Sequence, residues 1–214
     1  MTNPVTVLLV DDHAVVREGY LRLLERHGDI AVVGEARDAA TAHALFCSLN
    51  PQIVVMDITL PGTSGIDAMR RMLIHKPDAR VLMFSMHEEI IFARRALSAG
   101  AFGYVTKSSA PTVLVQAIHA VASGQKYLSP EIAQKLALRE AAIGDESAHG
   151  LSTREFEVLR LLARGQSVKE IAVGLGLNPK TIANHQSAIK QKLGADSAIQ
   201  LLRKASQLGL EVPD

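Results

Sequence analysis

Short apolar runs alternate with longer amphipathic stretches through the first half of the chain, and this alternation restricts the possible folds more than any other feature. The runs cover 5–10, 30–34, 53–56, 81–84 and 102–105 and are rich in Val, Ile, Leu and aromatic residues, which predicts five buried strands. Between them, apolar residues recur at helical spacing, as in Ala42, Leu45 and Leu49. Strands that alternate with helices predict right-handed parallel crossovers. We therefore expect an α/β fold with a five-stranded, doubly wound parallel sheet.

The chain from Leu151 onward has no strand signal and reads as a series of short helices. Four helix starts are marked by Ser152 with Glu155, Ser167 with Glu170, Asn178 with Pro179, and Ser197 with Gln200. The serine–glutamate pairs have the spacing of capping boxes, and Asn followed by Pro supplies a cap and a first-turn proline. Residues 167–193 thus form a helix, a short glycine-containing turn and a second helix, which is helix-turn-helix geometry.

The two patterns predict two domains, which suits a length of 214 residues. We expect the α/β domain to span 1–124 and the all-α helix-turn-helix domain to span 148–214. The segment between them, 125–147, carries turn signals at both ends and one short helix that follows Pro130, so we expect it to be a linker.

Composition excludes several classes of protein. No apolar run approaches the ~20 residues that span a bilayer, and the N-terminus lacks the pattern of a secretory signal, so we expect a cytoplasmic protein. The single cysteine, Cys47, forms no internal disulfide, and on an amphipathic helix we expect it to be a small buried hydrophobe. The eight histidines lack the paired spacing of a zinc site.

Polar side chains follow four of the predicted strands at the point where each strand ends. These residues are Asp11 and Asp12, Asp57, Ser85, and Lys107. Parallel topology gathers these strand ends at one edge of the sheet. Carboxylates held together repel one another and raise one another's pKa unless a cation lies among them. An all-oxygen cluster with room for water suits Mg²⁺.

Asp57 is the natural nucleophile of this cluster. It stands alone at the tip of the central strand, and the loop that follows contains Pro61, Gly62 and Gly65, which leave space above it. Mg²⁺ and Lys107 would neutralise an arriving phosphoryl group. A single aspartate at a strand end usually caps a helix or forms a turn. The joint placement on several strands is what carries the prediction.

The motifs VDDH, VVMDITLPGTSG, FSMH and GYVTK stand in an order that resembles the receiver domain of two-component response regulators, over residues 4–124. The resemblance implies that Asp57 accepts phosphate from a histidine kinase. It also implies that Asp12 and Asp57 bind Mg²⁺ together with the backbone carbonyl of Thr59, while Asp11 holds the ion through water.

The same resemblance assigns a switch. Ser85 and Lys107 would contact the phosphoryl group, and Ser85 and Tyr104 would form the switch pair. In this pair the hydroxyl group moves toward the phosphoryl group and the aromatic ring turns inward.

The third helix of the C-terminal part sorts its side chains into two faces. Ile182, Ile189 and Leu193 recur on one face, and polar residues lie opposite. Residues 178–195 contain three lysines and no acidic residue, which fits a surface laid against phosphates. The residues that we expect to contact DNA are Lys180, Thr181, Asn184, Ser187, Lys190 and Gln191. Asn184 has the chemistry to read a base edge in the major groove.

Residues 148–214 resemble the LuxR-type helix-turn-helix domain, and the whole chain resembles the NarL/FixJ family of response regulators. The family resemblance implies a fourth helix used for dimerisation. Ile199, Leu202 and Ala205 supply its apolar stripe, although internal packing is the commoner use of such a stripe.

The leading hypothesis is a transcription regulator switched by phosphorylation. Its partners would be a histidine kinase, double-stranded DNA and a second copy of the chain, and it would turn over no external substrate. Two alternatives remain open. One is an aspartyl-phosphate phosphatase, which needs a substrate cap domain that the helical tail does not resemble. The other is a receiver that works without phosphate as a protein-interaction module.

Overall fold

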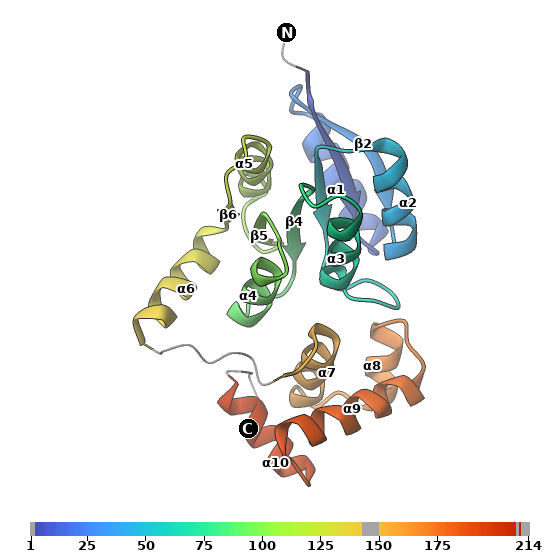
Figure 1. Ribbon diagram of the computed structural model, residues 1–214, viewed down its shortest axis with the longest axis vertical. Helices are drawn as coiled ribbons and strands as arrows, with labels where there is room; N and C mark the ends of the chain where they lie inside the picture. The colour runs from blue at the N-terminus through green and yellow to red at the C-terminus, as the bar shows by residue number, and fades with distance from the viewer. Residues whose placement is uncertain (1–2, 143–149, 209, 211–214) are drawn as a thin grey trace. The chain divides into compact units, whose positions relative to one another are not determined.

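The computed structural model describes residues 3–142, 150–208 and 210, and the chain divides into two compact units, Met1–Ala142 and Ile143–Asp214. The first unit combines a parallel sheet with helices, and the second is helical (Figure 1). Both fold classes agree with the prediction from the sequence.

The first unit contains six strands and six helices among its described residues. The strands are β1 (Val5–Val10), β2 (Ile30–Ala36), β3 (Ile53–Met56), β4 (Arg80–Ser85), β5 (Gly103–Thr106) and β6 (Tyr127–Leu128). The helices are α1 (Ala14–Glu25), α2 (Ala39–Leu49), α3 (Gly65–His75), α4 (Ile90–Ser98), α5 (Pro111–Ala122) and α6 (Pro130–Ala142).

The sheet has the order β2-β1-β3-β4-β5-β6, and every neighbouring pair is parallel. The chain runs outward in one direction from β1 to β2 and then returns past β1 to add β3 and the later strands. The order therefore reverses between β1 and β3. In open sheets of this kind the functional crevice lies beyond the carboxyl ends of the strands at such a switch point. Asp11 and Asp12 follow β1, and Asp57 follows β3.

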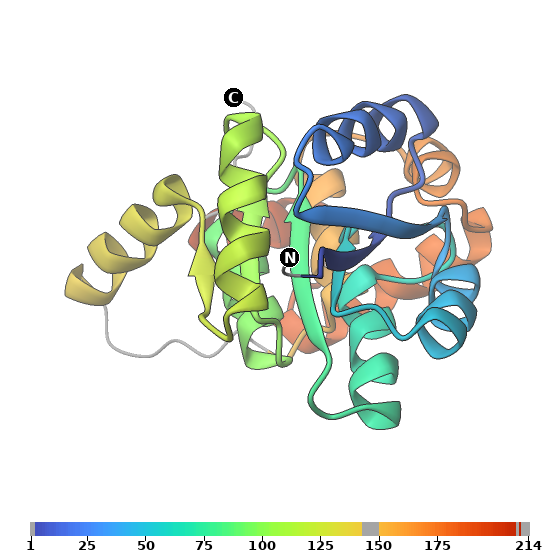
Figure 2. The same cartoon turned by 90° about the horizontal axis from the view of Figure 1, so that it is seen from above.

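Successive side chains of each strand point to opposite faces of the sheet, and a layer of helices covers each face. Val7, Val55 and Leu82 belong to a buried cluster with Leu24 of α1 and Ile118 of α5, so these two helices cover one face. The other face is covered by α2, α3 and α4 (Figure 2). Because both faces are covered, β3 is buried at every residue and β4 at every residue after Arg80, which explains their continuous apolar runs.

The sixth strand, β6, is absent from the prediction of a five-stranded sheet. Tyr127 and Leu128 pair with Gly103 and Tyr104 of β5. A β-carbon on Gly103 would lie 2.5 Å from the carbonyl oxygen of Tyr127, so the pairing needs glycine there. Two residues are too few to show any periodicity, which is why the sequence pattern missed this strand.

The segment expected to be a linker is in part built into the first unit. After β6, helix α6 lies against α4 and β5, and its Ile132 is fully buried. Residues 125–142 therefore pack with the α/β unit beyond the expected boundary at 124. The rest of the expected linker, 143–147, lies outside the described residues.

The expectation for Cys47 is wrong, because this residue is exposed. Helix α2 buries only Ala42 and Phe46 among its side chains. Cys47 follows Phe46 by one residue, which rotates it about 100° around the helix and away from the core.

Among its described residues, the second unit contains α7 (Thr153–Ala163), α8 (Val168–Gly174), α9 (Pro179–Leu193) and α10 (Ala198–Gln207). Both predicted capping boxes are present, and Asn178 caps α9 through its side chain with Pro179 in the first turn. At α10 the pattern differs in one bond. Ser197 accepts from the N–H of Gln200, but the Gln200 side chain accepts from the N–H of Asp196. The core of the unit includes Phe156, Ile171 and Ile182.

Candidate functional site

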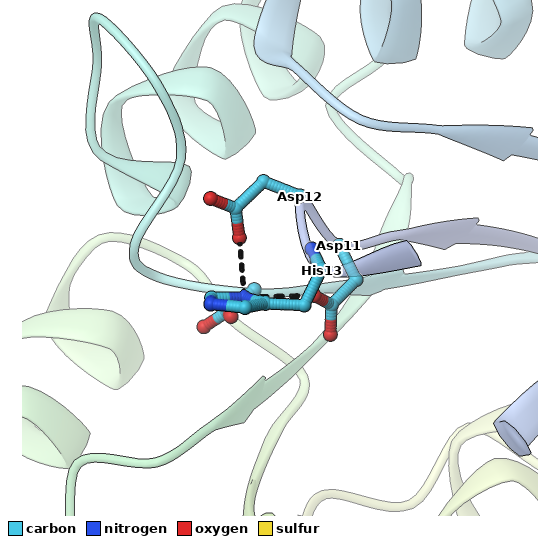
Figure 3. Close-up of side chains that lie close together, drawn as sticks. Asp11, Asp12 and His13 are labelled. Atoms are coloured by element: carbon cyan, nitrogen blue, oxygen red, sulfur yellow. Dashed lines mark hydrogen bonds and ion pairs between the residues drawn. The ribbon is translucent and has the colours of Figure 1, made fainter. Parts of the chain in front are cut away.

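The first strand ends in two carboxylates that differ in their exposure. Asp11 is buried, whereas about a quarter of the Asp12 side chain is exposed, at 24%. The backbone N–H of His13 donates to Oδ1 of Asp11 at 2.9 Å and turns the chain into α1. Figure 3 shows the His13 ring beside both carboxylates, with its Nδ1 2.8 Å from Asp12 Oδ1 and 3.5 Å from Asp11 Oδ1.

The third strand delivers Asp57, which is only 4% exposed, to the same edge of the sheet. Its backbone N–H donates to the carbonyl of Val10 at 2.9 Å, which fixes it beside the end of β1. Its Oδ1 accepts from the N–H of Thr59 at 3.3 Å. Gly65, the first residue of α3, packs so closely that an added β-carbon would lie 1.8 Å from the Asp57 carbonyl oxygen. Gly65 therefore does not leave open space near Asp57, as the sequence suggested, but allows the start of α3 to pack closely against its backbone.

Lys107 joins the two strand ends. Its ammonium nitrogen donates to Oδ2 of Asp11 at 2.6 Å and to Oδ2 of Asp57 at 2.5 Å, and its side chain is only 4% exposed. The N–H of Lys107 donates to the carbonyl of Ser85 at 2.8 Å, so β4 and β5 place it. The structure thus brings together Asp11, Asp57 and Lys107, as the strand-end argument predicts.

Burial acts on both charged partners. It raises the pKa of the Asp57 carboxyl above its ordinary range, against the lowering effect of the nearby Lys107. Burial alone would lower the pKa of the Lys107 ammonium, but the attraction of Asp57 and the hydrogen bonds to both carboxylates outweigh burial and raise it. Lys107 therefore stays protonated at neutral pH.

The donor set fits a divalent cation. Asp11, Asp12, His13 and Asp57 each offer a ligand atom, and these atoms all lie within 4.8 Å of one another. Oδ1 of Asp12 is shielded from solvent, and Nδ1 of His13 lies 2.8 Å from it. The cluster sets three carboxyl groups against one ammonium, and a divalent cation among them would offset their mutual repulsion. Carboxylate oxygens with water and a carbonyl are the ligands that Mg²⁺ prefers.

The two predicted switch residues, Ser85 and Tyr104, both contact the backbone of His87. Ser85 at the end of β4 is buried, and its Oγ accepts from the N–H of His87 at 3.4 Å. Tyr104 is fully buried, and its hydroxyl donates to the carbonyl of His87 at 2.7 Å. The aromatic ring therefore has the inward orientation in this structure.

Sequence reasoning missed His87, which lies two residues beyond the end of β4. It is only 3% exposed, and its Nε2 lies at hydrogen-bond distance, 3.0 Å, from Oγ1 of Thr59. The sequence could have indicated His87, because in the FSMH motif only Met86 separates it from Ser85, the last residue of a strand that ends at the acidic edge of the sheet. Nothing in the sequence pattern indicated that it is buried.

Helix α9 of the second unit separates its faces as predicted. Ile182, Ile189 and Leu193 are buried. Of the residues expected to contact DNA, Lys180, Asn184, Ser187 and Gln191 are exposed, and Thr181 and Lys190 are half-buried. In the last turn of α9, Lys192 donates to Oε2 of Glu155 at 2.6 Å and so links α9 to α7.

The expected dimer stripe on α10 is divided between surface and interior. Ile199 is 68% exposed, Leu202 is half-buried, and Ala205 is fully buried in the second unit. Internal packing therefore uses the part of the stripe that contains Ala205.

Comparisons with known proteins match both units. The family model of the response regulator receiver domain matches residues 7–119, and that of bacterial regulatory proteins of the luxR family matches residues 149–205. Response regulator GacA of Pseudomonas aeruginosa is 37% identical over 208 residues, which cover 96% of this chain and 97% of GacA. Response regulator UvrY of Escherichia coli is 36% identical over 209 residues, which cover 96% and 95% of the two chains.

Solved structures give the same result. A LuxR-family two-component response regulator from Aurantimonas has 50% sequence identity and a TM-score of 0.64, and the match covers 65% of this chain and 99% of that one. RcsB of Salmonella typhimurium has 30% identity and a TM-score of 0.68, with coverage of 97% and 99%. No helix in the described part of the chain has the length and apolar character needed to span a membrane. The acidic edge of the sheet, the helix-turn-helix unit and these matches together show that the chain belongs to the NarL/FixJ family of two-component response regulators, which join a receiver domain to a LuxR-type DNA-binding domain.

Proposed function

We propose that Asp57 accepts a phosphoryl group from the phosphohistidine of a histidine kinase and that this event controls DNA binding by the second unit. The observation that carries the proposal is the buried contact of Lys107 with both Asp11 and Asp57. This contact places a positive charge beside Asp57, the carboxylate that follows the central strand β3.

The transfer is a substitution at phosphorus. A carboxylate oxygen of Asp57 forms the new P–O bond, the P–N bond to the kinase imidazole breaks, and that imidazole takes up a proton. Lys107, which already donates to Asp57, is within reach of oxygens on a phosphoryl group attached there. The hydroxyl of Ser85 is the candidate donor to another of these oxygens.

A Mg²⁺ ion would supply charge neutralisation for the transferring group. We propose that Asp12, Asp57 and the backbone carbonyl of Thr59 bind it directly and that Asp11 binds it through water. The ligand atoms that Asp11, Asp12 and Asp57 bring within 4.8 Å of one another support this ligand set. Hydrolysis of the acyl phosphate would end the signal, without turnover of an external substrate.

The second unit would read the signal. We propose that Lys180 and Lys190 bind phosphates, that Thr181, Ser187 and Gln191 line the groove, and that Asn184 contacts a base edge. Dimerisation would use the α10 stripe, with Ile199 and Leu202 facing the second copy and Ala205 supporting them from within. Supporting precedents are the RcsB structures solved with DNA, as two dimers on two DNAs, and on a promoter with the phosphomimetic BeF₃⁻. The receiver would cover 1–124 and the DNA-binding domain 148–214, with 125–147 connecting them and its part 125–142 packed on the first unit.

Intact-mass measurement tests the proposal. We expect a small phosphodonor such as acetyl phosphate to add one phosphoryl group to the full-length chain only when Mg²⁺ is present. Asp57→Asn should abolish the addition, whereas Asp67→Asn, at a half-buried carboxylate in the first turn of α3, should not. Addition to Asp57→Asn at the parent rate would refute the assignment. No addition to the parent would favour a receiver that works without phosphate.

A further inference from the structure

His87, in the loop after β4, contacts the loop after β3 and helix α4. Its Nε2 is 3.0 Å from Oγ1 of Thr59, a residue of the loop after β3 that is 28 positions earlier in the chain. Its ring stacks on Phe92 of α4, with ring centroids 4.1 Å apart and planes 10° apart. The imidazole is therefore held on its edge by one loop and on its face by a helix.

The backbone of the same residue contacts the switch pair. The carbonyl of His87 accepts from the hydroxyl of Tyr104, and its N–H donates to Oγ of Ser85. The buried position of Tyr104 thus depends on where the His87 backbone lies. The contacts of the His87 side chain fix that backbone.

We propose that His87 is a positioning residue. Its hydrogen bond to Thr59 couples the loop that supplies the proposed metal-binding carbonyl to the inward orientation of Tyr104. The coupling of the side chains stands on the contacts above, and its role in signalling rests on the proposed function. When the loop after β3 shifts around a phosphorylated Asp57, His87 carries the shift to the carbonyl that holds Tyr104.

The chain offers a direct reporter of this coupling, because it contains only three tyrosines, Tyr20, Tyr104 and Tyr127. Incorporation of 3-fluorotyrosine therefore gives a ¹⁹F spectrum that single Tyr→Phe variants assign. The variant His87→Phe keeps an aromatic ring to stack on Phe92 but has no ring nitrogen. The variant Thr59→Val removes the hydroxyl from the other side and leaves the backbone carbonyl in place.

We expect each variant to shift the Tyr104 resonance toward the position of a solvent-exposed tyrosine while Tyr127 stays unchanged. The ratio of inward to outward Tyr104 should fall about two- to tenfold, the change that corresponds to one net hydrogen bond. The double variant should resemble either single variant, because both remove the same interaction. His75→Phe, at an exposed histidine that ends α3, should leave the resonance in place.

Two results would overturn the proposal. One is an unchanged Tyr104 resonance in both folded single variants, which would mean that His87 only fills space. The other is a double variant whose effect is the sum of the single effects. These spectra need no phosphodonor, so they are independent of whether Asp57 accepts phosphate. A failure of phosphorylation would appear in the intact-mass measurement and not here.

Discussion

Lys107 acts as the permanent positive charge of the receiver site. Its ammonium lies within 2.6 Å of Asp11 and 2.5 Å of Asp57, and all three side chains are buried. Buried ions of one sign are costly unless they are paired and hydrogen-bonded. The lysine thus lets the fold keep acidic groups at the sheet edge before any metal or phosphoryl group arrives.

Substitution of this lysine should reveal the charge balance. Lys107→Met leaves Asp11 and Asp57 without their ammonium, and we expect it to lower the free energy of unfolding by about 3–5 kcal/mol in the presence of EDTA. Mg²⁺ should recover part of this loss, because the ion supplies the missing positive charge. Urea unfolding followed by circular dichroism measures both values, with the exposed Lys126→Met as control. An equal loss with and without Mg²⁺ would argue against an ion among these carboxylates.

The charged part of the site could be predicted from the sequence, and its coupling could not. Aspartates and a lysine at strand tips have few alternatives once parallel topology gathers those tips. His87 was missed because its role depends on a contact with Thr59, a residue of another loop, and on stacking against a helix. Such contacts follow from packing, and neither residue type nor spacing announces them.

At the scale of elements, the site depends on how α3 begins. Ser64 caps this helix by accepting from the N–H of Ile66 at 3.2 Å, and Thr59 and Ser64 form a bridge across the loop. The N–H of Gly65 donates to the carbonyl of Ile58 at 2.7 Å. The loop after Asp57 is therefore closed back onto the start of α3, with no room for a side chain at Gly65.

Gly65→Ala should disturb the site through the backbone. The new β-carbon would collide with the Asp57 carbonyl, so we expect a loss of about 1–3 kcal/mol in the free energy of unfolding and slower phosphoryl incorporation. Unfolding in urea and intact mass give the two results. Gly19→Ala in α1 has no atom within 4 Å of the new carbon and should lower neither. Parent-like behaviour of Gly65→Ala would show that the loop has more room than the structure indicates.

At the start of α7, the capping residue Glu155 leads us to expect that the stability of this helix depends on pH. Burial raises the pKa of Glu155, but hydrogen bonds from Lys192 and from Ser152 outweigh it and hold the pKa below the ordinary glutamate value. A depressed folded-state pKa stabilises the fold above the unfolded pKa, and this stabilisation is lost as pH falls through the folded value.

Glu155→Gln should therefore destabilise α7 by about 1 kcal/mol at pH 7, the usual worth of a cap, and by less near pH 3. Amide hydrogen exchange of α7 peptides in the full-length chain, compared with the parent at each pH, measures this. Glu170→Gln, which removes the capping glutamate of α8, should leave α7 exchange unchanged. A penalty that is the same at both pH values would show that ionisation of Glu155 does not contribute.

Element starts and strand positions were largely predictable, since caps and apolar runs are local signals. The runs predicted β1 and β3 with their observed bounds, and Ser152, Ser167 and Asn178 cap the helices as expected. The failures have other causes. Strand β6 has two residues and exists because β5 leaves an edge to pair with, and Cys47 is exposed because α2 buries a narrow face. Both depend on neighbours that a local pattern does not contain.

At the scale of the whole molecule, the chain has two units with separate cores, and each contains one of the two regions that define the family. The first contains the acidic edge, and the second contains the polar face of α9. Within the first unit, the carbonyl of Tyr104 accepts from the N–H of Ser129, and Lys135 of α6 donates to the carbonyl of Glu88. The loop after β4 and the last helix of this unit are therefore bonded to each other, and that helix leads into the segment toward the DNA-binding domain.

Substitutions on the proposed DNA-binding face should distinguish a residue that binds phosphates from one that reads a base. Lys180→Ala should weaken binding to all sequences and lower the slope of log affinity against log salt by about 1. Asn184→Ala should cost about 1–3 kcal/mol at one base position and relax the preference there. Titration of full-length, phosphodonor-treated protein with selected and scrambled duplexes measures both, with Lys126→Ala as control. Equal losses on both duplexes for Asn184→Ala would remove its base-reading role.

A transient acyl phosphate at one aspartate is the step on which the proposed switch depends most. Borohydride reduces an aspartyl phosphate to homoserine, so treatment of the phosphodonor-labelled chain with borohydride followed by peptide mass spectrometry locates the bond. We predict homoserine at position 57, dependent on Mg²⁺, and intact aspartate at positions 11 and 12. Homoserine at either of those positions, or conversion at position 57 that is unaffected by EDTA, would contradict the account.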